Sequence, residues 1–130
     1  MSQPGPEWHV KVADFGLTRE VVSDEAAQKY THQIGTYGYM APEMWKNIPY
    51  SSAIDVWALG AITFCMRTGK PPFPDPTILG EYQRNPRAFP DHELWGSTEP
   101  CKRFIRKAMA PDARKRLTVA AVLDHDWLRG

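Results

Sequence analysis

The strongest pattern of apolar residues lies in the middle of the chain, between Ser51 and Gly69. Ser51 or Ser52 is suited to cap the start of a helix, and Gly69 is suited to end it. Apolar side chains occupy nearly every position of residues 53–68, which leaves the predicted helix almost no polar face. Because a helix that is apolar on all sides is a buried one, we expect this helix to be the axis of the core.

Weaker patterns predict the elements that precede this helix. Trp8, Val10 and Val12 alternate with polar residues up to Ala13, which is typical of a half-buried strand. Residues 14–50 show no sustained period and predict a long, mostly irregular loop. Loops of this length inside a domain usually carry function.

Capping residues and apolar spacing predict shorter helices in the remainder of the chain. The sequence therefore favours a mainly α fold, a helical bundle around one buried helix with a short N-terminal strand element. The later helices are expected at about 78–83, from a cap at Ser97 or Thr98 through Met109, and from a cap at Thr118 through about Trp127.

Composition places the chain among single globular domains. It has 130 residues, 42% hydrophobic and 24% charged, with a formal net charge of +1. This balance excludes a strongly basic nucleic-acid protein. The two cysteines, Cys65 and Cys101, lie far apart, which favours an intracellular, reducing setting over a disulfide framework. The apolar stretch around residues 62–66 is far too short to cross a bilayer, and residues 1–6 do not resemble a signal peptide.

One cluster of basic residues leaves two interpretations open, a nucleic-acid surface or a solvated helix face. No aromatic residues interleave with the cluster to stack on bases, so the solvated face is favoured. The cluster consists of Lys102, Arg103, Arg106, Lys107, Arg114 and Lys115.

Candidate chemistry begins directly after the predicted strand, at Asp14-Phe15-Gly16. A carboxylate at a strand end, followed by a permissive glycine, can place an oxygen on a hard cation such as Mg²⁺. A single tripeptide is a weak signal, but further motifs follow it in order. They are Gly35-Thr36-Tyr37-Gly38-Tyr39-Met40, Ala41-Pro42-Glu43, Asp55-x-Trp57-x-x-Gly60, Asp112-x-x-x-Arg116-Leu117-Thr118 and His125-x-Trp127.

With this set of motifs, the chain resembles the C-terminal lobe of a eukaryotic protein kinase. The resemblance covers residues 10–128 as a partial kinase domain, with residues 1–9 as a truncated entry turn. It implies a kinase-like C-lobe helical bundle, ATP and Mg²⁺ as cofactors of the complete domain, and a protein substrate. The residues before Ala41-Pro42-Glu43 resemble the serine/threonine branch, because tyrosine kinases usually carry a basic residue and Trp there.

The resemblance also implies roles for individual residues. Asp14 would bind the Mg²⁺ that bridges the ATP phosphates, with Phe15 and Gly16 completing the cofactor-binding motif. Gly35, Thr36 and Tyr39 would shape the pocket for the substrate residue after the acceptor hydroxyl. Thr31 is a candidate phosphorylation site in the activation segment, where a phosphate would order the loop.

Two carboxylates have a structural role in the resemblance, and each has an alternative. Glu43 would form a buried ion pair with Arg116, or serve as an anion in the first turn behind Pro42. Asp55 would be a buried acceptor for catalytic-loop backbone, which its apolar neighbours favour. Alternatively, Asp55 completes a capping box with Ser52.

The 130 residues contain no glycine-rich phosphate loop, no strand lysine and no His-Arg-Asp catalytic loop. We therefore expect this chain to be a fragment of a serine/threonine kinase, inactive by itself, and cytoplasmic or nuclear. A pseudokinase-like binding module and a non-functional truncated product are the alternatives. The sequence predicts no nucleic-acid or membrane partner and leaves the oligomeric state unknown.

Overall fold

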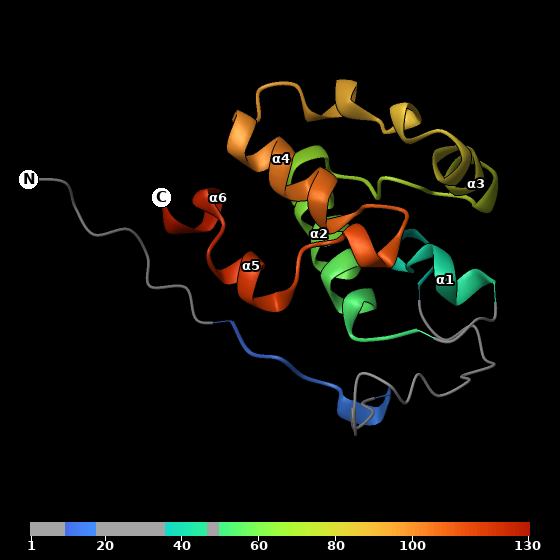
Figure 1. Ribbon diagram of the computed structural model, residues 1–130, viewed down its shortest axis with the longest axis horizontal. Coiled ribbons are helices and arrows are strands. Elements are labelled where there is room, and N and C mark those ends of the chain that lie inside the picture. The colour runs from blue at the N-terminus through green and yellow to red at the C-terminus, as the bar shows by residue number, and fades with distance from the viewer. Residues whose placement is uncertain (1–9, 18–35, 47–49) are drawn as a thin grey trace, which may run out of the picture.

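The computed structural model describes residues 10–17, 36–46 and 50–130 (Figure 1). These residues form helices joined by short loops and contain no strand, which confirms a mainly α fold. The α-helices are α1 (Pro42–Trp45), α2 (Ala53–Thr68), α3 (Pro76–Arg84), α4 (Glu99–Ala108), α5 (Val119–Leu123) and α6 (Asp126–Arg129). Short 3-10 helices occur at η1 (Phe15–Leu17), η2 (Tyr37–Tyr39), η3 (Pro86–Ala88), η4 (Asp91–Leu94) and η5 (Ala113–Lys115).

Helix α2 has the bounds that the sequence predicts. At its start, the hydroxyl of Ser51 accepts a hydrogen bond from the Ala53 N–H, whereas Ser52 makes no side-chain cap. At its end, Gly69 adopts φ 78°, and its N–H donates to the Cys65 carbonyl at 2.7 Å. This left-handed turn is the conformation that glycine adopts at lowest cost, so the helix ends here.

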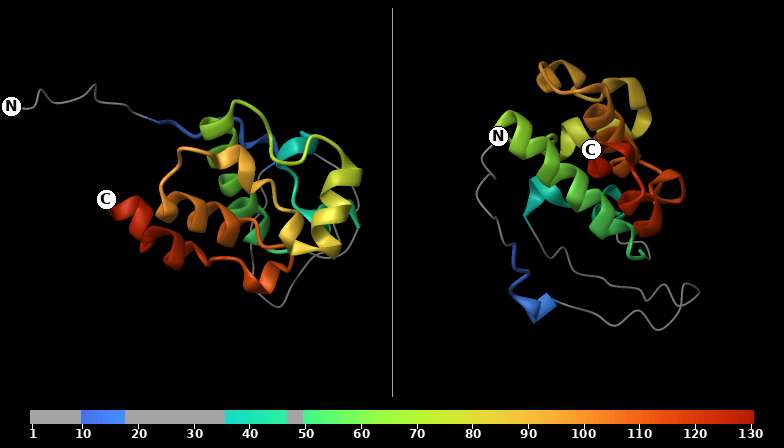
Figure 2. Two further views of the ribbon diagram at one scale, coloured as in Figure 1. Left: turned by 90° about the horizontal axis from the view of Figure 1, so that it is seen from above. Right: turned by 90° about the vertical axis from the view of Figure 1, so that its left-hand side faces the viewer.

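Helix α4 packs directly on α2, and the two helices form the centre of the structure (Figures 1 and 2). The two helices approach closely at Gly60, where an added Cβ would lie 2.6 Å from Met109 Cγ and 2.9 Å from Ala108 Cβ. The missing side chain at this position therefore determines how close the two helices come. Phe104 and Ile105 of α4 are fully buried beside this contact.

An aromatic cluster extends the core from α2 towards α3. The rings of Phe73 and Tyr82 stack with centroids 4.9 Å apart, and Trp57 and Phe89 lie next to this pair. The Tyr82 hydroxyl donates to the Met109 carbonyl at 2.9 Å. Burial raises the pKa of Tyr82 to about 12, so this hydroxyl stays protonated and remains a hydrogen-bond donor.

Helix α2 is the axis of the core, but one of its faces is not buried. Leu59, Ile62 and Met66 are 39%, 47% and 81% exposed, and their spacing places them on one side of the helix. We call these residues the open face of α2. The described residues cover this face only in part, because α4 and the aromatic cluster both pack elsewhere on α2.

The predicted strand is also absent over residues 10–13, the part of it that the structure describes. Val10 and Val12 are 91% and 79% exposed, and the backbone from residue 10 to 13 has no regular structure. A strand needs a neighbouring chain segment to satisfy its N–H and C=O groups, and no described segment lies alongside. Trp8, where the predicted strand begins, and the entry turn at residues 1–9 lie outside the described residues.

The helix predicted from Thr118 to Trp127 is two helices. Thr118 caps α5 as expected, through its hydroxyl and the Ala121 N–H at 3.1 Å. The break follows at His125, which has extended backbone angles and accepts the Trp127 N–H on Nδ1 at 3.2 Å. His125 thus caps α6. Its ring packs on Phe104, with centroids 5.3 Å apart.

Substitution of Gly60 should show how tightly α2 and α4 pack. We expect Gly60→Ala to lower the free energy of unfolding by about 1–3 kcal/mol, because the new methyl group overlaps Met109 and Ala108. Gly80→Ala in α3 is the matched control, since a Cβ there meets nothing within 4 Å. That control should be neutral or stabilising by up to about 1 kcal/mol. Urea denaturation measures both, and equal effects of the two substitutions would contradict the packing argument.

The open face of α2 should make the isolated chain prone to association. We expect the 130-residue chain to bind a hydrophobic dye and to sediment as mixed oligomers. Replacing Leu59, Ile62 and Met66 together by Gln should reduce both signals without loss of helix content. Replacing Val119 and Leu123, which are exposed apolar residues of α5, by Gln in the same way is the control for general surface hydrophobicity. A monodisperse wild-type chain that binds no hydrophobic dye would refute this expectation.

Candidate functional site

Two of the predicted substrate-pocket residues, Thr36 and Tyr39, lie at the turn Tyr37–Tyr39. Thr36 precedes the turn and is exposed, while Tyr39 ends it and is half-buried; the Tyr39 N–H donates to the Thr36 carbonyl at 3.0 Å. Between them, a Cβ on Gly38 would lie 2.5 Å from Pro71 Cβ. The turn therefore lies directly against the loop after α2, and only glycine fits at its centre.

Side chains fix this turn on both sides. The Tyr39 hydroxyl donates to Cys65 Sγ of α2 at 3.4 Å, and this hydrogen bond raises the pKa of Tyr39. On the other side, the Tyr37 ring packs on Trp45 of α1 with centroids 4.8 Å apart. The turn is thus held between two helices, with Thr36 facing solvent.

Helix α1 is anchored by an ion pair that the resemblance implies. Arg116 Nη1 donates to Glu43 Oε1 at 2.5 Å, and Nη2 donates to Oε2 at 2.7 Å. The Arg116 side chain is fully buried and that of Glu43 is 9% exposed. The first-turn position of Glu43 behind Pro42, which was the alternative, is present as well. A bidentate ion pair that is buried to this extent is strong, because water does not reach either charged group to replace its partner.

Arg116 also binds backbone carbonyls of the surrounding segments. Its guanidinium donates to Ala110 at 2.8 Å, to Ala53 at 3.2 Å and to Pro111 at 3.4 Å. The same group lies 5.0 Å from the centroid of the Trp57 ring. One side chain therefore connects α1, the start of α2 and the loop after α4. Neither spacing nor residue type gives a sequence signal for these carbonyl contacts.

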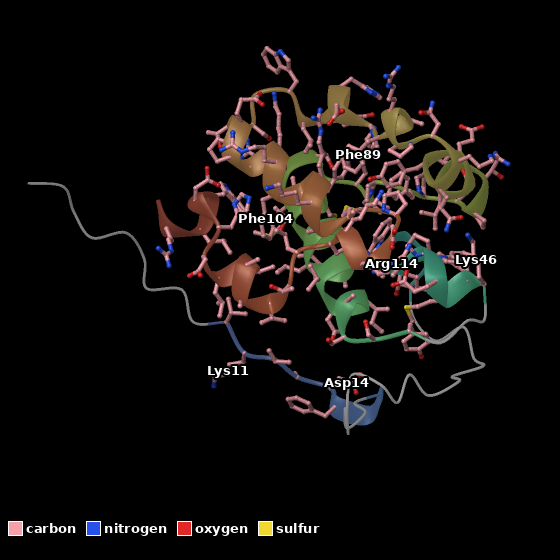
Figure 3. The ribbon with its side chains drawn as sticks, viewed as in Figure 1. Lys11, Asp14, Lys46, Phe89, Phe104 and Arg114 are labelled. Carbon is pink, nitrogen blue, oxygen red and sulfur yellow. The ribbon has the colours of Figure 1, made fainter. Side chains whose placement is uncertain are left out.

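Asp14 directly precedes η1 and lies away from the α-helices (Figure 3). Its φ is 62°, and one carboxylate oxygen accepts the Gly16 N–H at 3.3 Å. Asp14 is exposed, and so is Phe15, at 65%. The described ranges contain no group of His, Cys, Asp and Glu that could hold a metal ion. Asp14 is thus suited to supply one ligand to Mg²⁺, but the described residues do not complete a metal site.

The structure brings together some of the predicted site residues. Thr36, Tyr39, Glu43 and Arg116 form one connected region, whereas Asp14 stands apart from it. Gly35 and the phosphorylation candidate Thr31 lie outside the described residues.

The capping-box interpretation of Asp55 is wrong, whereas its role as an acceptor for catalytic-loop backbone stays a prediction, because the described residues include no such loop. The Asp55 side chain is exposed, and it makes no hydrogen bond to the described residues; Ser52 makes no side-chain cap either, so there is no capping box. Asp55 lies one turn before Leu59, at the beginning of the open face of α2. The apolar neighbours that favoured a buried acceptor are buried on the other sides of the helix.

Removal of either partner of the Glu43–Arg116 pair should be costly. We expect Glu43→Ala and Arg116→Ala each to lower the free energy of unfolding by about 3–5 kcal/mol, because the remaining charge is left buried and unpaired. The double variant should lose far less than the sum. The matched control is the exposed pair of Arg103 and Asp126, at 2.5 Å, whose coupling should stay below about 1 kcal/mol. Additive losses at Glu43 and Arg116 in a denaturant series would show that the two residues are not coupled.

Known proteins match this chain over nearly its whole length. The model of the protein kinase domain matches residues 3–128. Calcium/calmodulin-dependent protein kinase type 1B of Rattus norvegicus is 36% identical over 131 residues, which cover 98% of this chain and 37% of that protein. Calcium/calmodulin-dependent protein kinase cmkB of Emericella nidulans is 36% identical over 121 residues, covering 90% of this chain and 30% of that protein. The type II alpha chain of Drosophila melanogaster is 35% identical over 122 residues, covering 92% and 23% respectively.

These matches agree with the motifs, the helical architecture and the buried Glu43–Arg116 pair. The chain spans about a third of the length of the type 1B relatives, so it corresponds to part of such a protein. The family generally uses ATP and Mg²⁺ and acts on protein substrates. On this evidence the chain belongs to the eukaryotic protein kinase superfamily, in its serine/threonine branch.

Proposed function

We propose that this chain is the C-terminal lobe of a serine/threonine protein kinase, which in the complete domain transfers a phosphoryl group from ATP to protein Ser or Thr. The observation that supports this most strongly is the anchoring of residues 36–43. Tyr39 bonds to Cys65 of α2, and Glu43 bonds to the buried Arg116. A peptide-binding surface needs such a rigid base, because positioning of the reacting groups supplies much of phosphoryl transfer.

The roles of individual residues follow from this proposal. Gly35, Thr36 and Tyr39 shape the pocket for the substrate residue after the acceptor hydroxyl, and the solvent-facing Thr36 is consistent with that role. Asp14 supplies one oxygen ligand to Mg²⁺ in the complete domain, where other residues supply the remainder. Thr31 is the proposed phosphorylation site.

The proposed partners are ATP and a protein substrate, with no nucleic acid. Four residues of the basic cluster pair with carboxylates, which supports the solvated face: Lys102 with Glu99, Arg103 with Asp126, Arg106 with Asp91 and Arg114 with Asp112. We also propose an intracellular location. No helix within the described ranges is long and apolar enough to span a membrane.

A second candidate is a binding module without catalysis. It is favoured by one observation, the separation of Asp14 from the anchored turn. In that case the helical surface would bind a partner while Asp14 has no chemical role.

A chimera separates the two candidates. The part of rat calcium/calmodulin-dependent protein kinase type 1B that precedes the matched region would be joined ahead of this chain. We expect the chimera to phosphorylate peptides with a Ser or Thr acceptor in an assay with labelled ATP. It should not phosphorylate a peptide whose acceptor is Tyr. Asp14→Asn should reduce the rate by a factor on the order of 10²–10³, as loss of comparable electrostatic stabilisation does in other enzymes. The 130-residue chain alone should transfer nothing.

Asp75→Asn is the control, because Asp75 caps α3 through the N–H groups of Thr77 and Ile78 and Asn can do the same. The control should keep the activity of the parent chimera. A chimera that melts cooperatively but transfers no phosphate would contradict the kinase proposal and favour the binding module. Transfer by the isolated chain that depends on Asp14 would also contradict the assignment of roles.

A further inference from the structure

A hollow of about 430 Å³ lies between α1, the C-terminal end of α3 and the loop after α4. We call it the α1–α3 hollow. Its walls include Pro42, Lys46, Tyr50, Gln83, Asp112 and Arg114. The volume lies within the range of roughly 300–1,000 Å³ that is typical of ligand sites. The hollow is distinct from the Thr36–Tyr39 turn and from Asp14, which do not line it.

The acidic groups of the hollow are already neutralised. Both carboxylate oxygens of Glu43 are bound by Arg116. Asp112 accepts from the Arg114 backbone N–H at 3.0 Å, from Nε at 3.1 Å and from Nη2 at 2.9 Å. These bonds, the Arg114 side chain first, hold the pKa of Asp112 at about 2, so its charge is permanent but compensated. The acids therefore have little attraction left for a cationic ligand.

The basic groups, in contrast, keep donors for a ligand. Lys46 is exposed and forms no ion pair with the described residues. The Arg114 side chain is 89% exposed, and its Nη1 group donates to no described residue. Figure 3 shows both side chains on the same part of the molecule, and both line the hollow. The charged groups that keep unused hydrogen-bonding capacity at this site are thus cationic.

The remaining walls suit an apolar group and a peptide backbone. Pro42, Pro111 and Ala113 contribute apolar surface to the hollow. Gln83 is half-buried, and its amide has no described partner; such an amide can donate to one main-chain carbonyl and accept from one main-chain N–H. A ligand that satisfies all three features has an apolar side chain, a polypeptide main chain and adjacent carboxylates.

We propose that the α1–α3 hollow is a docking site for an acidic peptide segment of a partner protein. An apolar side chain of the segment occupies the hollow, the Gln83 amide binds its main chain, and its carboxylates pair with Lys46 and Arg114. This site goes beyond the proposed function, because it requires neither ATP nor phosphoryl transfer.

Fluorescence anisotropy with the full 130-residue chain tests the proposal directly. The probe is a labelled peptide of sequence Glu-Asp-Phe-Glu-Asp. We expect saturable binding that weakens as salt is raised. Lys46→Gln and Arg114→Gln should each weaken binding about two- to fivefold, and the double variant about tenfold, as expected for exposed ion pairs. Ala113→Phe should abolish binding by filling the hollow, while circular dichroism shows unchanged helix content.

Two controls separate the hollow from general charge attraction. Lys115→Gln removes a neighbouring exposed charge that does not line the hollow and should leave binding unchanged. The peptide Glu-Asp-Ser-Glu-Asp, without the apolar side chain, should bind at least about tenfold more weakly than the Phe peptide.

The proposal is overturned by any of four results. These are no saturable binding, equal binding of the Ser and Phe peptides, equal weakening by Lys115→Gln, and competition by an oligonucleotide as strong as that by the unlabelled peptide. Sedimentation adds a further test. Self-association that disappears in the Lys46→Gln, Arg114→Gln double variant would show that a second copy occupies the hollow, and would also refute a peptide partner.

Discussion

The buried guanidinium of Arg116 is the constraint on which the rest of the described structure depends. It neutralises Glu43 and binds three backbone carbonyls, and so connects segments that are far apart in the chain. Placing a charge in the interior is unfavourable unless it is fully paired, so these segments must come together in one arrangement or leave the charge unsatisfied. The position of α1 follows from this requirement. Through Trp45 and Tyr37, the position of the Thr36–Tyr39 turn follows as well.

The elements that the sequence predicts well are those with local signals. Helix α2 ends before Gly69, which makes a left-handed turn, and α4 begins after Thr98, whose hydroxyl accepts the Cys101 N–H. These signals act over a few residues and do not depend on distant packing. The Glu43–Arg116 pair was also predictable, but only through the family resemblance. Its carbonyl partners were not, because backbone positions carry no sequence signal.

The features that the sequence misses depend on tertiary surroundings. An apolar composition predicts that α2 is buried, yet burial requires a neighbour on every side, and the described residues leave Leu59, Ile62 and Met66 39%, 47% and 81% exposed. Asp55 is exposed for the same reason. The break at His125 was missed because histidine is a less common cap than Ser, Thr, Asp or Asn. The α1–α3 hollow combines residues from separate segments, and no linear pattern marks it.

The two described ends of the segment from Asp14 to Glu43 have different physical character. Glu43 is fixed by a buried bidentate pair, whereas Asp14 has a left-handed backbone conformation supported by one exposed hydrogen bond. That conformation costs about 1–2 kcal/mol for a residue other than glycine, although Asp tolerates it better than most, and an exposed hydrogen bond offsets only part of this cost. A ligand that binds more tightly when Asp14 is in this conformation would raise the population of this conformation. The size of the shift is set by the difference between the ligand's affinities for the two conformations. The Glu43 end offers no such freedom. In the proposed kinase, the substrate side of the site is therefore preformed by the fold, and the metal side depends on what binds there.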